Sequence, residues 1–160
     1  MGAVLMLSIA ASPGFAATKQ KAQMCATDGD LAALNVRVLQ TEMMVAALSC
    51  GERQRYNTFV TDYQTVLTQR GRALQTMFVK THGNKAEPRL NAFITKLAND
   101  ASKDVRLRGD TYCEFAAELF DEVLAGGPAN LNKVASKPWI ESRHGFHPCI
   151  VEARSRKQTG

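Results

Sequence analysis

The sequence predicts an all-α protein: an antiparallel bundle of three long helices with an irregular C-terminal tail, crosslinked by disulfides. Three observations lead to this prediction. Apolar residues recur at helical spacing, without an alternation of β-branched residues. Between Leu31 and Leu124 the chain has only four glycines and one proline, Pro88. Its four cysteines follow an N-terminal signal pattern, which favours two disulfides.

The first helix is expected from Leu31 to Cys50. Asp28 and Asp30 precede it as suitable N-caps, and Gly51 follows it as a C-terminal stop. Apolar residues occupy most sides of this helix, and Glu42 is the one acidic residue within it. A helix of this kind is normally surrounded by other helices, so we expect it to be the most buried of the bundle.

The second helix is expected from Glu52 to Lys80, with one apolar stripe that Arg70 alone interrupts. The stripe consists of Tyr56, Val60, Tyr63, Leu67, Leu74 and Met77. The segment from Thr81 to Asn84 is expected to end the helix and turn the chain, because Gly83 can adopt the left-handed conformation.

The third helix is expected from Pro88, a residue suited to a first helical turn, to Leu124. Its apolar stripe keeps its phase across Gly109, which favours one continuous or mildly kinked helix. The alternative is a break at Gly109, which would give four helices, with Thr111 and Glu114 forming a capping box.

From Gly127 the composition changes to prolines and few periodic apolar residues, with the single tryptophan, Trp139. We expect this segment to fold back over the bundle with at most short helical turns, and the residues from Arg154 to be disordered. The predicted organisation is therefore a signal peptide over 1–16, a helical bundle over 17–126 and a tail over 127–160.

The signal peptide is predicted from an apolar run between Ala3 and Ala11 and from small residues at the cleavage positions before Ala17. No Lys or Arg precedes the run, which favours a start codon upstream of Met1. The run is too short to span a bilayer, and no other stretch is expected to do so. The sequence thus predicts a periplasmic or secreted protein without a transmembrane segment.

Four cysteines allow three connectivities. A descending second helix lowers the chain by roughly 40 Å, and the climb from Pro88 to Cys113 recovers about 38 Å, at about 1.5 Å per residue. This brings Cys113 back to the level of Cys50. Cys25 lies nearer the other end, where the returning tail would bring Cys149. We therefore predict the disulfides Cys50–Cys113 and Cys25–Cys149.

One alternative for the tail is a metal site. His144, His147 and Cys149 lie within six residues, and imidazole with thiolate suits zinc or copper. A fourth ligand would come from elsewhere, such as His82 or a carboxylate. The oxidising compartment and the three possible cysteine partners favour a disulfide at Cys149 instead, so no metal is expected.

No catalytic motif stands out: the chain has no Gly-x-Ser-x-Gly turn, no Cys-x-x-Cys pair and no glycine-rich phosphate loop. Glu42 is the one candidate for a carboxylate enzyme that acts on cell-wall polymer. Its other interpretations are a surface position or an ion pair with Arg37 or Arg70. The net charge of +5 is spread along the chain without a basic stripe, which argues against nucleic acid.

Two stretches, "MVAALSCGERQRYNTFV" and "YCEFAAELFDEV", resemble the small secreted helical proteins of alphaproteobacteria. The resemblance implies a Gram-negative periplasmic location and carries no functional residue. We therefore expect a non-enzymatic exported protein without a cofactor that binds an envelope protein or an anionic envelope polymer. The alternatives are the enzyme that uses Glu42 and the metal-binding protein.

Overall fold

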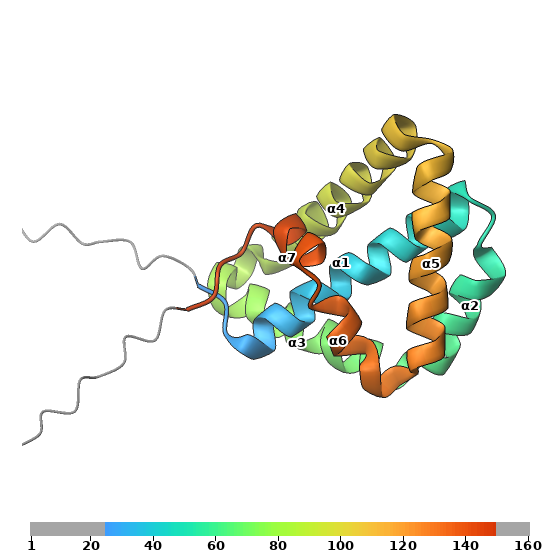
Figure 1. Cartoon of the computed structure of the whole chain (residues 1–160). Coiled ribbons are helices and arrows are strands. Elements are labelled where there is room, and N and C mark those ends of the chain that lie inside the picture. Colours follow the sequence, from blue (N-terminus) through green and yellow to red (C-terminus); the bar gives the residue numbers. More distant parts are fainter. Residues whose placement is uncertain (1–24, 150–160) are drawn as a thin grey trace, which may run out of the picture.

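The computed structural model describes residues 25–149 and confirms the all-α prediction (Figure 1). The predicted signal peptide and the residues from Arg154 lie outside this range. The elements follow in the order α1 (Asp28–Ser49), α2 (Arg53–Asp62), α3 (Gln64–His82), η1 (Gly83–Lys85), α4 (Ala86–Arg108), α5 (Asp110–Gly126), η2 (Pro128–Asn130), α6 (Leu131–Ala135) and α7 (Pro138–His144). α3 returns antiparallel to α1, and α4 runs antiparallel to α3.

Helix α1 is the central helix, as predicted, and packs against α2 to α7. Its N-cap is Thr27, whereas Asp28 and Asp30 were expected in this role. The Thr27 Oγ1 atom accepts a hydrogen bond from the Asp30 N–H at 3.3 Å, and the Asp30 carboxylate accepts one from the Thr27 N–H at 3.1 Å. Asp30 thus completes a capping box, a role that its place three residues after Thr27 allows.

The predicted helix from Glu52 to Lys80 is wrong in one respect: it breaks at Tyr63 into α2 and α3. The Tyr63 side chain is buried, stacks on Phe59 with ring centroids 4.9 Å apart, and donates a hydrogen bond to the Val123 carbonyl. Val123 belongs to α5 and lies sixty residues away in sequence, and no glycine or proline marks the break. The single apolar stripe could not reveal it.

The continuous third helix is also wrong. Helix α4 ends at Arg108, and Gly109 has a φ of 52°, a conformation that disfavours side chains. The stated alternative, a break at Gly109, is what the structure has, although Thr111 and Glu114 form no capping box there. Figure 1 shows a sharp corner between α4 and α5. This corner lays Tyr112 and the rest of α5 across α1.

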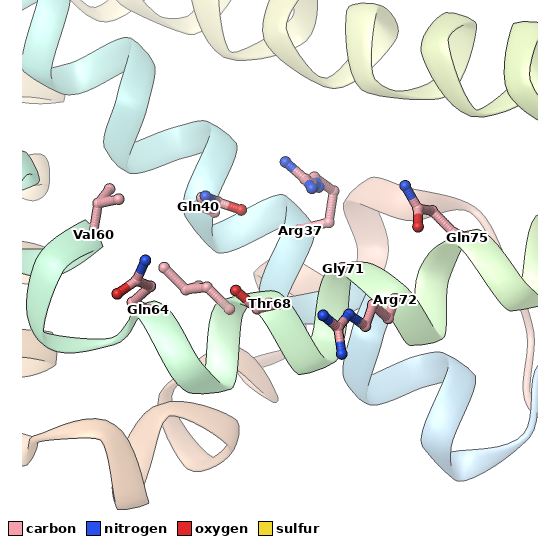
Figure 2. A pocket seen from close by; sticks show the side chains of 9 residues that line it. Arg37, Gln40, Val60, Gln64, Thr68, Gly71, Arg72 and Gln75 are labelled. Carbon is pink, nitrogen blue, oxygen red and sulfur yellow. The ribbon is translucent and has the colours of Figure 1, made fainter.

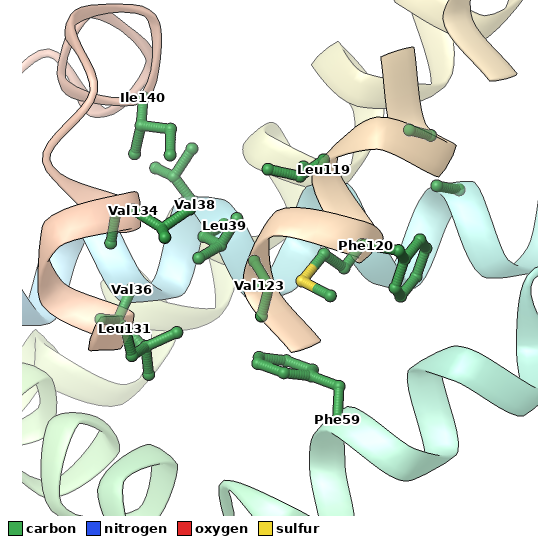
Figure 3. Close-up of a cluster of buried hydrophobic side chains, with 14 of the residues drawn as sticks. Val36, Val38, Leu39, Phe59, Leu119, Phe120, Val123, Leu131, Val134 and Ile140 are labelled. Atoms are coloured by element: carbon green, nitrogen blue, oxygen red, sulfur yellow. The ribbon is translucent and has the colours of Figure 1, made fainter. Parts of the chain in front are cut away.

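The core consists of two clusters of buried side chains. The larger one surrounds the middle and end of α1, and Figure 3 shows Val38, Leu39, Phe59, Phe120, Val134 and Ile140 within it. The smaller one joins the start of α1 to α3 and α4 through Leu34, Leu74, Met77 and Phe78. Burying a side chain of this size stabilises the fold by about 1.5–3 kcal/mol. Because α1 contributes side chains to both clusters, it connects the two parts of the core.

The tail packs back on the bundle, with two short helices, α6 and α7, lying against α1. Its end runs beside the start of the described chain. The Ala26 N–H donates to the His147 carbonyl at 2.9 Å, and the Cys149 N–H donates to the Ala26 carbonyl at 3.0 Å. Phe146 packs against both Phe78 and Phe93, and the three rings form a cluster with centroids 5.6–6.3 Å apart.

Both predicted disulfides are present. Cys25–Cys149 joins Cα atoms 4.6 Å apart, and Cys50–Cys113 joins Cα atoms 5.4 Å apart. The second bridge ties the end of α1 to the first turn of α5, because the corner at Gly109 occurs after α4 has climbed back to that level. Each closes a long loop and contributes about 4 kcal/mol in the chain-entropy model. All cysteines being paired indicates an oxidising compartment.

Among residues 25–149, α1 alone is long and apolar enough by composition to cross a membrane, with a mean hydropathy of 1.3. The prediction that no stretch after the signal peptide has the length and composition of a membrane-spanning helix is therefore wrong for α1. Because 67% of that window is buried inside the molecule, its composition is that of a core helix.

Candidate functional site

A groove lies between α1 and the α2–α3 arm, with a volume of about 370 Å³ (Figure 2). We call it the basic groove. Its lining residues are Arg37 and Gln40 from α1, Val60 from α2, and Gln64, Leu67, Thr68, Gly71, Arg72 and Gln75 from α3. A shallower hollow of about 640 Å³ continues along α3 and shares Gln64, Thr68 and Arg72 with the groove. Together they form an extended surface of mixed polar and apolar character, and no carboxylate of the described residues lines it.

The arginines in and beneath the basic groove have no acidic partner among the residues that the structure describes. Seven ion pairs occur among residues 25–149, and none of them includes Arg37, Arg70 or Arg72. Arg37 is half-buried, and burial lowers the pKa of its guanidinium, while the nearby Tyr56 hydroxyl opposes this shift. A guanidinium that loses water without gaining a carboxylate raises the free energy of the folded state.

Arg70 does not line the basic groove and lies beneath it. A narrow cavity beneath the groove is lined by Arg37, Gln40, Leu67, Arg70 and Gly71, together with Ala33, Val36 and Leu74. The Nε atom of Arg70 is buried there and has no hydrogen-bond partner. A buried unsatisfied donor is rare in folded proteins. The narrow cavity beside it has an accessible volume close to zero, so it has no room for a water molecule or an ion.

Gly71 separates Arg70 from Arg72 in the interior of α3 and lines both the groove and the narrow cavity. A glycine in the middle of a helix costs roughly 0.5–1 kcal/mol relative to alanine. Apart from the two flanking residues and the backbone of α3, no atom lies within 4 Å of a Cβ built at this position, so packing against other elements does not require a glycine. A side chain here would extend into open space.

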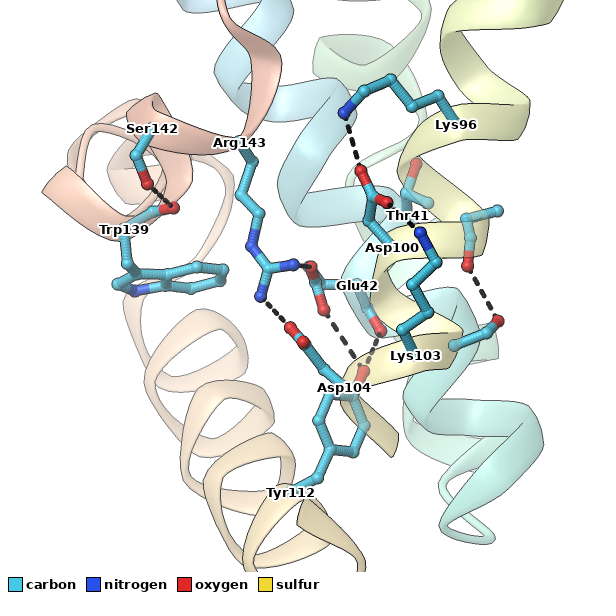
Figure 4. A network of polar contacts seen from close by, with 12 residues as sticks. Thr41, Glu42, Lys96, Asp100, Lys103, Asp104, Tyr112, Trp139, Ser142 and Arg143 are labelled. Atoms are coloured by element: carbon cyan, nitrogen blue, oxygen red, sulfur yellow. Dashed lines mark hydrogen bonds and ion pairs between the residues drawn. The ribbon is translucent and has the colours of Figure 1, made fainter. Parts of the chain in front are cut away.

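On the opposite side, Glu42 belongs to a satisfied polar network, shown in Figure 4. We call it the Glu42 network. The buried Glu42 carboxylate lies 3.5 Å from the Arg143 guanidinium and accepts a hydrogen bond from the Tyr112 hydroxyl at 3.3 Å. Arg143 also forms an ion pair with Asp104. The network therefore joins α1, α4, α5 and α7.

Burial raises the pKa of the Glu42 carboxyl above its usual range, while the Arg143 charge and the Tyr112 hydrogen bond act in the opposite direction. Burial and the neighbouring Glu42 raise the pKa of the Tyr112 hydroxyl. Neither the surface position nor the pairing with Arg37 or Arg70 that the sequence suggested for Glu42 is correct. Its carboxylate is engaged by Arg143 and Tyr112 and does not line the basic groove.

The metal alternative loses its thiolate, because Cys149 is bonded to Cys25. Both ring nitrogens of the buried His144 are also engaged. Its Nδ1 atom accepts from the Phe146 N–H at 3.0 Å, so its Nε2–H donates to the Asn35 side-chain oxygen at 3.0 Å. Burial lowers the pKa of His144, which favours this neutral form. His147 is exposed, and the described residues contain no cluster of His, Cys, Asp and Glu placed to hold a metal ion.

Comparison with protein-family models, with curated proteins and with solved structures finds no match for this chain. The basic groove was not predicted from the sequence. Three signals were present: Arg37 within an apolar helix, Arg70 within an apolar stripe, and Gly71 within a long helix. What the sequence could not show is that these three positions line one narrow cavity and that, among the described residues, no carboxylate lines it.

Proposed function

We propose that this protein is an exported, non-enzymatic binding protein whose basic groove holds an anionic polymer of the cell envelope. The observation that carries the proposal is the set of unpaired arginines along a groove without a carboxylate. Guanidinium groups bind oxyanions through charge-assisted hydrogen bonds, and such a groove attracts and retains a polyanion.

The neutral side chains of the groove support a polymer that carries hydroxyl or amide groups beside its charges. Gln40, Gln64 and Gln75 can each donate and accept hydrogen bonds, and Thr68 adds a hydroxyl. The hollow that continues along α3 provides room for a chain longer than a single small molecule.

Export rests on the signal pattern of residues 1–16, on the two disulfides and on the resemblance to small secreted helical proteins of alphaproteobacteria. We place the mature protein in the periplasm or the medium. The packing of α1 against α2 and α3 shapes the groove before any ligand binds, and a preorganised site loses less entropy on binding.

Two experiments test this function. Oxidised mature protein is first incubated with the insoluble envelope fraction and sedimented. We expect it to pellet with the envelope, and the double variant Arg37→Gln/Arg72→Gln to remain in the supernatant. The variant Arg106→Gln, which removes one exposed charge at the far end of α4, should pellet like the wild type.

The second experiment is a pull-down from periplasmic extract. A stoichiometric protein partner that the groove variants still bind would contradict a polymer ligand. Wall-degrading activity that disappears in Glu42→Gln would instead support an enzyme.

A further inference from the structure

We propose that His144 makes the packing of residues 145–147 depend on pH, so that this segment opens away from the molecule when the imidazole is protonated. We call residues 145–147 the flap. The inference is independent of the basic groove and of the proposed function. It follows from the hydrogen bonds of the buried imidazole, from the aromatic contacts of Phe146 and from the disulfide at Cys149.

The hydrogen bonds of His144 require its neutral form. The Phe146 backbone N–H can only donate, so the His144 Nδ1 atom, 3.0 Å away, accepts and carries no proton. The proton of the neutral ring is therefore on Nε2, which donates to the Asn35 side-chain oxygen at 3.0 Å. Protonation would add a hydrogen at Nδ1 and set two donors against each other. The bond that holds the Phe146 backbone would then be lost.

The surroundings of His144 also disfavour its protonated form. The side chain is buried, and none of the seven ion pairs among residues 25–149 includes it. Burial lowers the pKa of the imidazole, Glu141 on the preceding turn of α7 raises it, and His147 lowers it. Helix α1 presents the neutral Asn35 to the ring. A proton on His144 would therefore lack a carboxylate in contact with it.

The other charged groups near α7 and the aromatic cluster have partners of their own. Arg143, the neighbour of His144, is bound by Glu42 of α1 and Asp104 of α4. On α3, the His82 ring packs on Phe78 with centroids 5.5 Å apart. His82 is therefore a second imidazole beside the cluster, and an experiment must distinguish its titration from that of His144.

The flap covers this aromatic cluster. The centroid of the Phe146 ring lies 5.8 Å from that of Phe93 and 6.3 Å from that of Phe78, and Phe78 is only 3% exposed. Gly145, with a φ of 71°, ends α7 and turns the chain toward the cluster. Once the bond to His144 is broken, Phe146 is held through its ring alone. Protonation should therefore expose Phe78 and Phe93 to solvent.

Both ends of the flap are fixed. Cys149 is bonded to Cys25, and the Ala26 backbone binds the His147 carbonyl and the Cys149 N–H. At the other end, α7 packs against α1. Protonation would therefore open the flap as a short loop between two anchors, and it would not release the tail.

The direction of the pH dependence follows from burial. In the open form water reaches His144, so its pKa returns toward the ordinary value for histidine, whereas the closed form has a lower pKa. Lowering the pH between these two pKa values favours the open form by up to about tenfold per pH unit. The contribution of His144 to stability is thus fully present above the open-state pKa and is lost as the pH falls through the closed-state pKa.

Hydrogen exchange of the Phe146 amide in the oxidised mature protein tests the proposal. It is measured by nuclear magnetic resonance across a pH series that spans the titration range of histidine. We expect the protection factor of Phe146 to fall with the pH, by up to about tenfold per pH unit. The Ala26 and Cys149 amides, which lie beyond the flap, should keep their protection. Nuclear Overhauser contacts between the Phe146 and Phe93 rings should weaken over the same pH range.

Three variants assign the effect, because the chain has three histidines. His144→Asn places an oxygen near the position of Nδ1 but does not titrate, so the protection of Phe146 should no longer depend on pH. His82→Asn and His147→Asn should retain the wild-type dependence. Should His144→Asn fail to fold, the ring ¹⁵N signals of the wild type give the titration of His144 directly, and its midpoint must coincide with the change at Phe146.

Three results would overturn the proposal. One is a His144 ring that titrates while the protection of Phe146 stays constant. Another is a pH dependence that follows His82 or His147, either in the midpoint or in the variants. The third is an equal loss of protection at Phe146 and Cys149, because the whole tail would then unfold and the flap would not open by itself.

Discussion

The two sides of α1 differ in whether their buried charges have partners of opposite charge. On the side that faces α4, α5 and α7, Glu42 is matched by Arg143, which also pairs with Asp104. On the side that faces α3, within residues 25–149, Arg37 has no carboxylate partner and the Nε atom of Arg70 has no hydrogen-bond partner. Helix α1 therefore carries a neutralised carboxylate, Glu42, on one face and an arginine without a counter-charge among the described residues, Arg37, on the other.

The difference separates a structural role from a binding role. The matched Glu42 network holds four helices together, and none of its residues lines the basic groove. An unmatched set of arginines weakens the fold unless something external neutralises it. The protein keeps the second arrangement where a glycine also leaves room, so we assign ligand binding to the α3 side and stability to the Glu42 side.

The largest expected effect is on the matched side. Arg143→Met leaves Glu42 in the core without its counter-charge, and breaking a buried pair in this way typically costs 3–5 kcal/mol. Arg143 is partly exposed, with 25% of its side-chain surface accessible, so we expect the lower end, about 3 kcal/mol. Urea unfolding at pH 7 measures it. A loss below about 1 kcal/mol would mean that the network is not structural.

The glycine that shapes the matched side should resist substitution. Gly109 has a φ of 52°, which an alanine adopts only with strain, and it turns α5 so that Tyr112 reaches Glu42. We expect Gly109→Ala to lower the free energy of unfolding by about 1–2 kcal/mol. Unchanged stability in urea would show that α4 and α5 can join without this corner.

The glycine that shapes the groove should respond in the opposite direction. Gly71 lies inside α3, and a Cβ atom would meet open space. Without ligand, Gly71→Ala should therefore raise the free energy of unfolding by about 0.5–1 kcal/mol. Thermal unfolding in a phosphate-free buffer provides the measurement. A destabilised variant would indicate that Gly71 is required for packing.

The smallest expected effect is a pH dependence of the Glu42 network. Burial raises the pKa of Glu42, so between its unfolded and folded pKa values the folded state binds more protons than the unfolded state. The contribution of Glu42 to stability is thus fully present below the unfolded pKa and is lost as the pH rises through the folded pKa.

Glu42→Gln lacks this titration, whereas all other carboxyl groups are common to both proteins. The stability of the wild type relative to Glu42→Gln should therefore fall as the pH rises through this window. Urea unfolding across a pH series tests it, and a difference that grows with pH would reverse the sign of the assigned pKa shift.

The sequence predicts much of the architecture because helical spacing and turn residues are local signals. The central α1, the turn at Gly83 and both disulfides follow from spacing and helix rise. The break at Tyr63 does not, since a hydrogen bond to Val123, far along the chain, fixes it. At Gly109 the unbroken apolar stripe favoured a continuous helix, whereas glycine readily adopts the positive φ at which α4 ends. The stripe was the misleading signal.

The candidate site could be predicted less well for the same reason. Arg37 and Arg70 are each visible as a polar residue among apolar neighbours, but a single helix does not reveal what it faces. Which charges have partners depends on the packing of α1 between α3 and α7. Arg143, which neutralises Glu42, lies 101 positions later in the sequence and could not be identified as its partner from spacing.

The most direct test of the contrast between the two sides follows the arginine side chains themselves. Nuclear magnetic resonance of ¹⁵N-arginine protein resolves Nε–H signals. Single variants at each position, Arg37→Gln, Arg70→Gln, Arg72→Gln, Arg106→Gln and Arg143→Met, assign them. On titration with inorganic phosphate as a simple oxyanion, we expect the signals of Arg37 and Arg72 to shift along one binding curve while that of Arg143 stays in place. Signals in the groove that do not move, or that move no more than those of Arg143 and the exposed Arg106, would contradict the account.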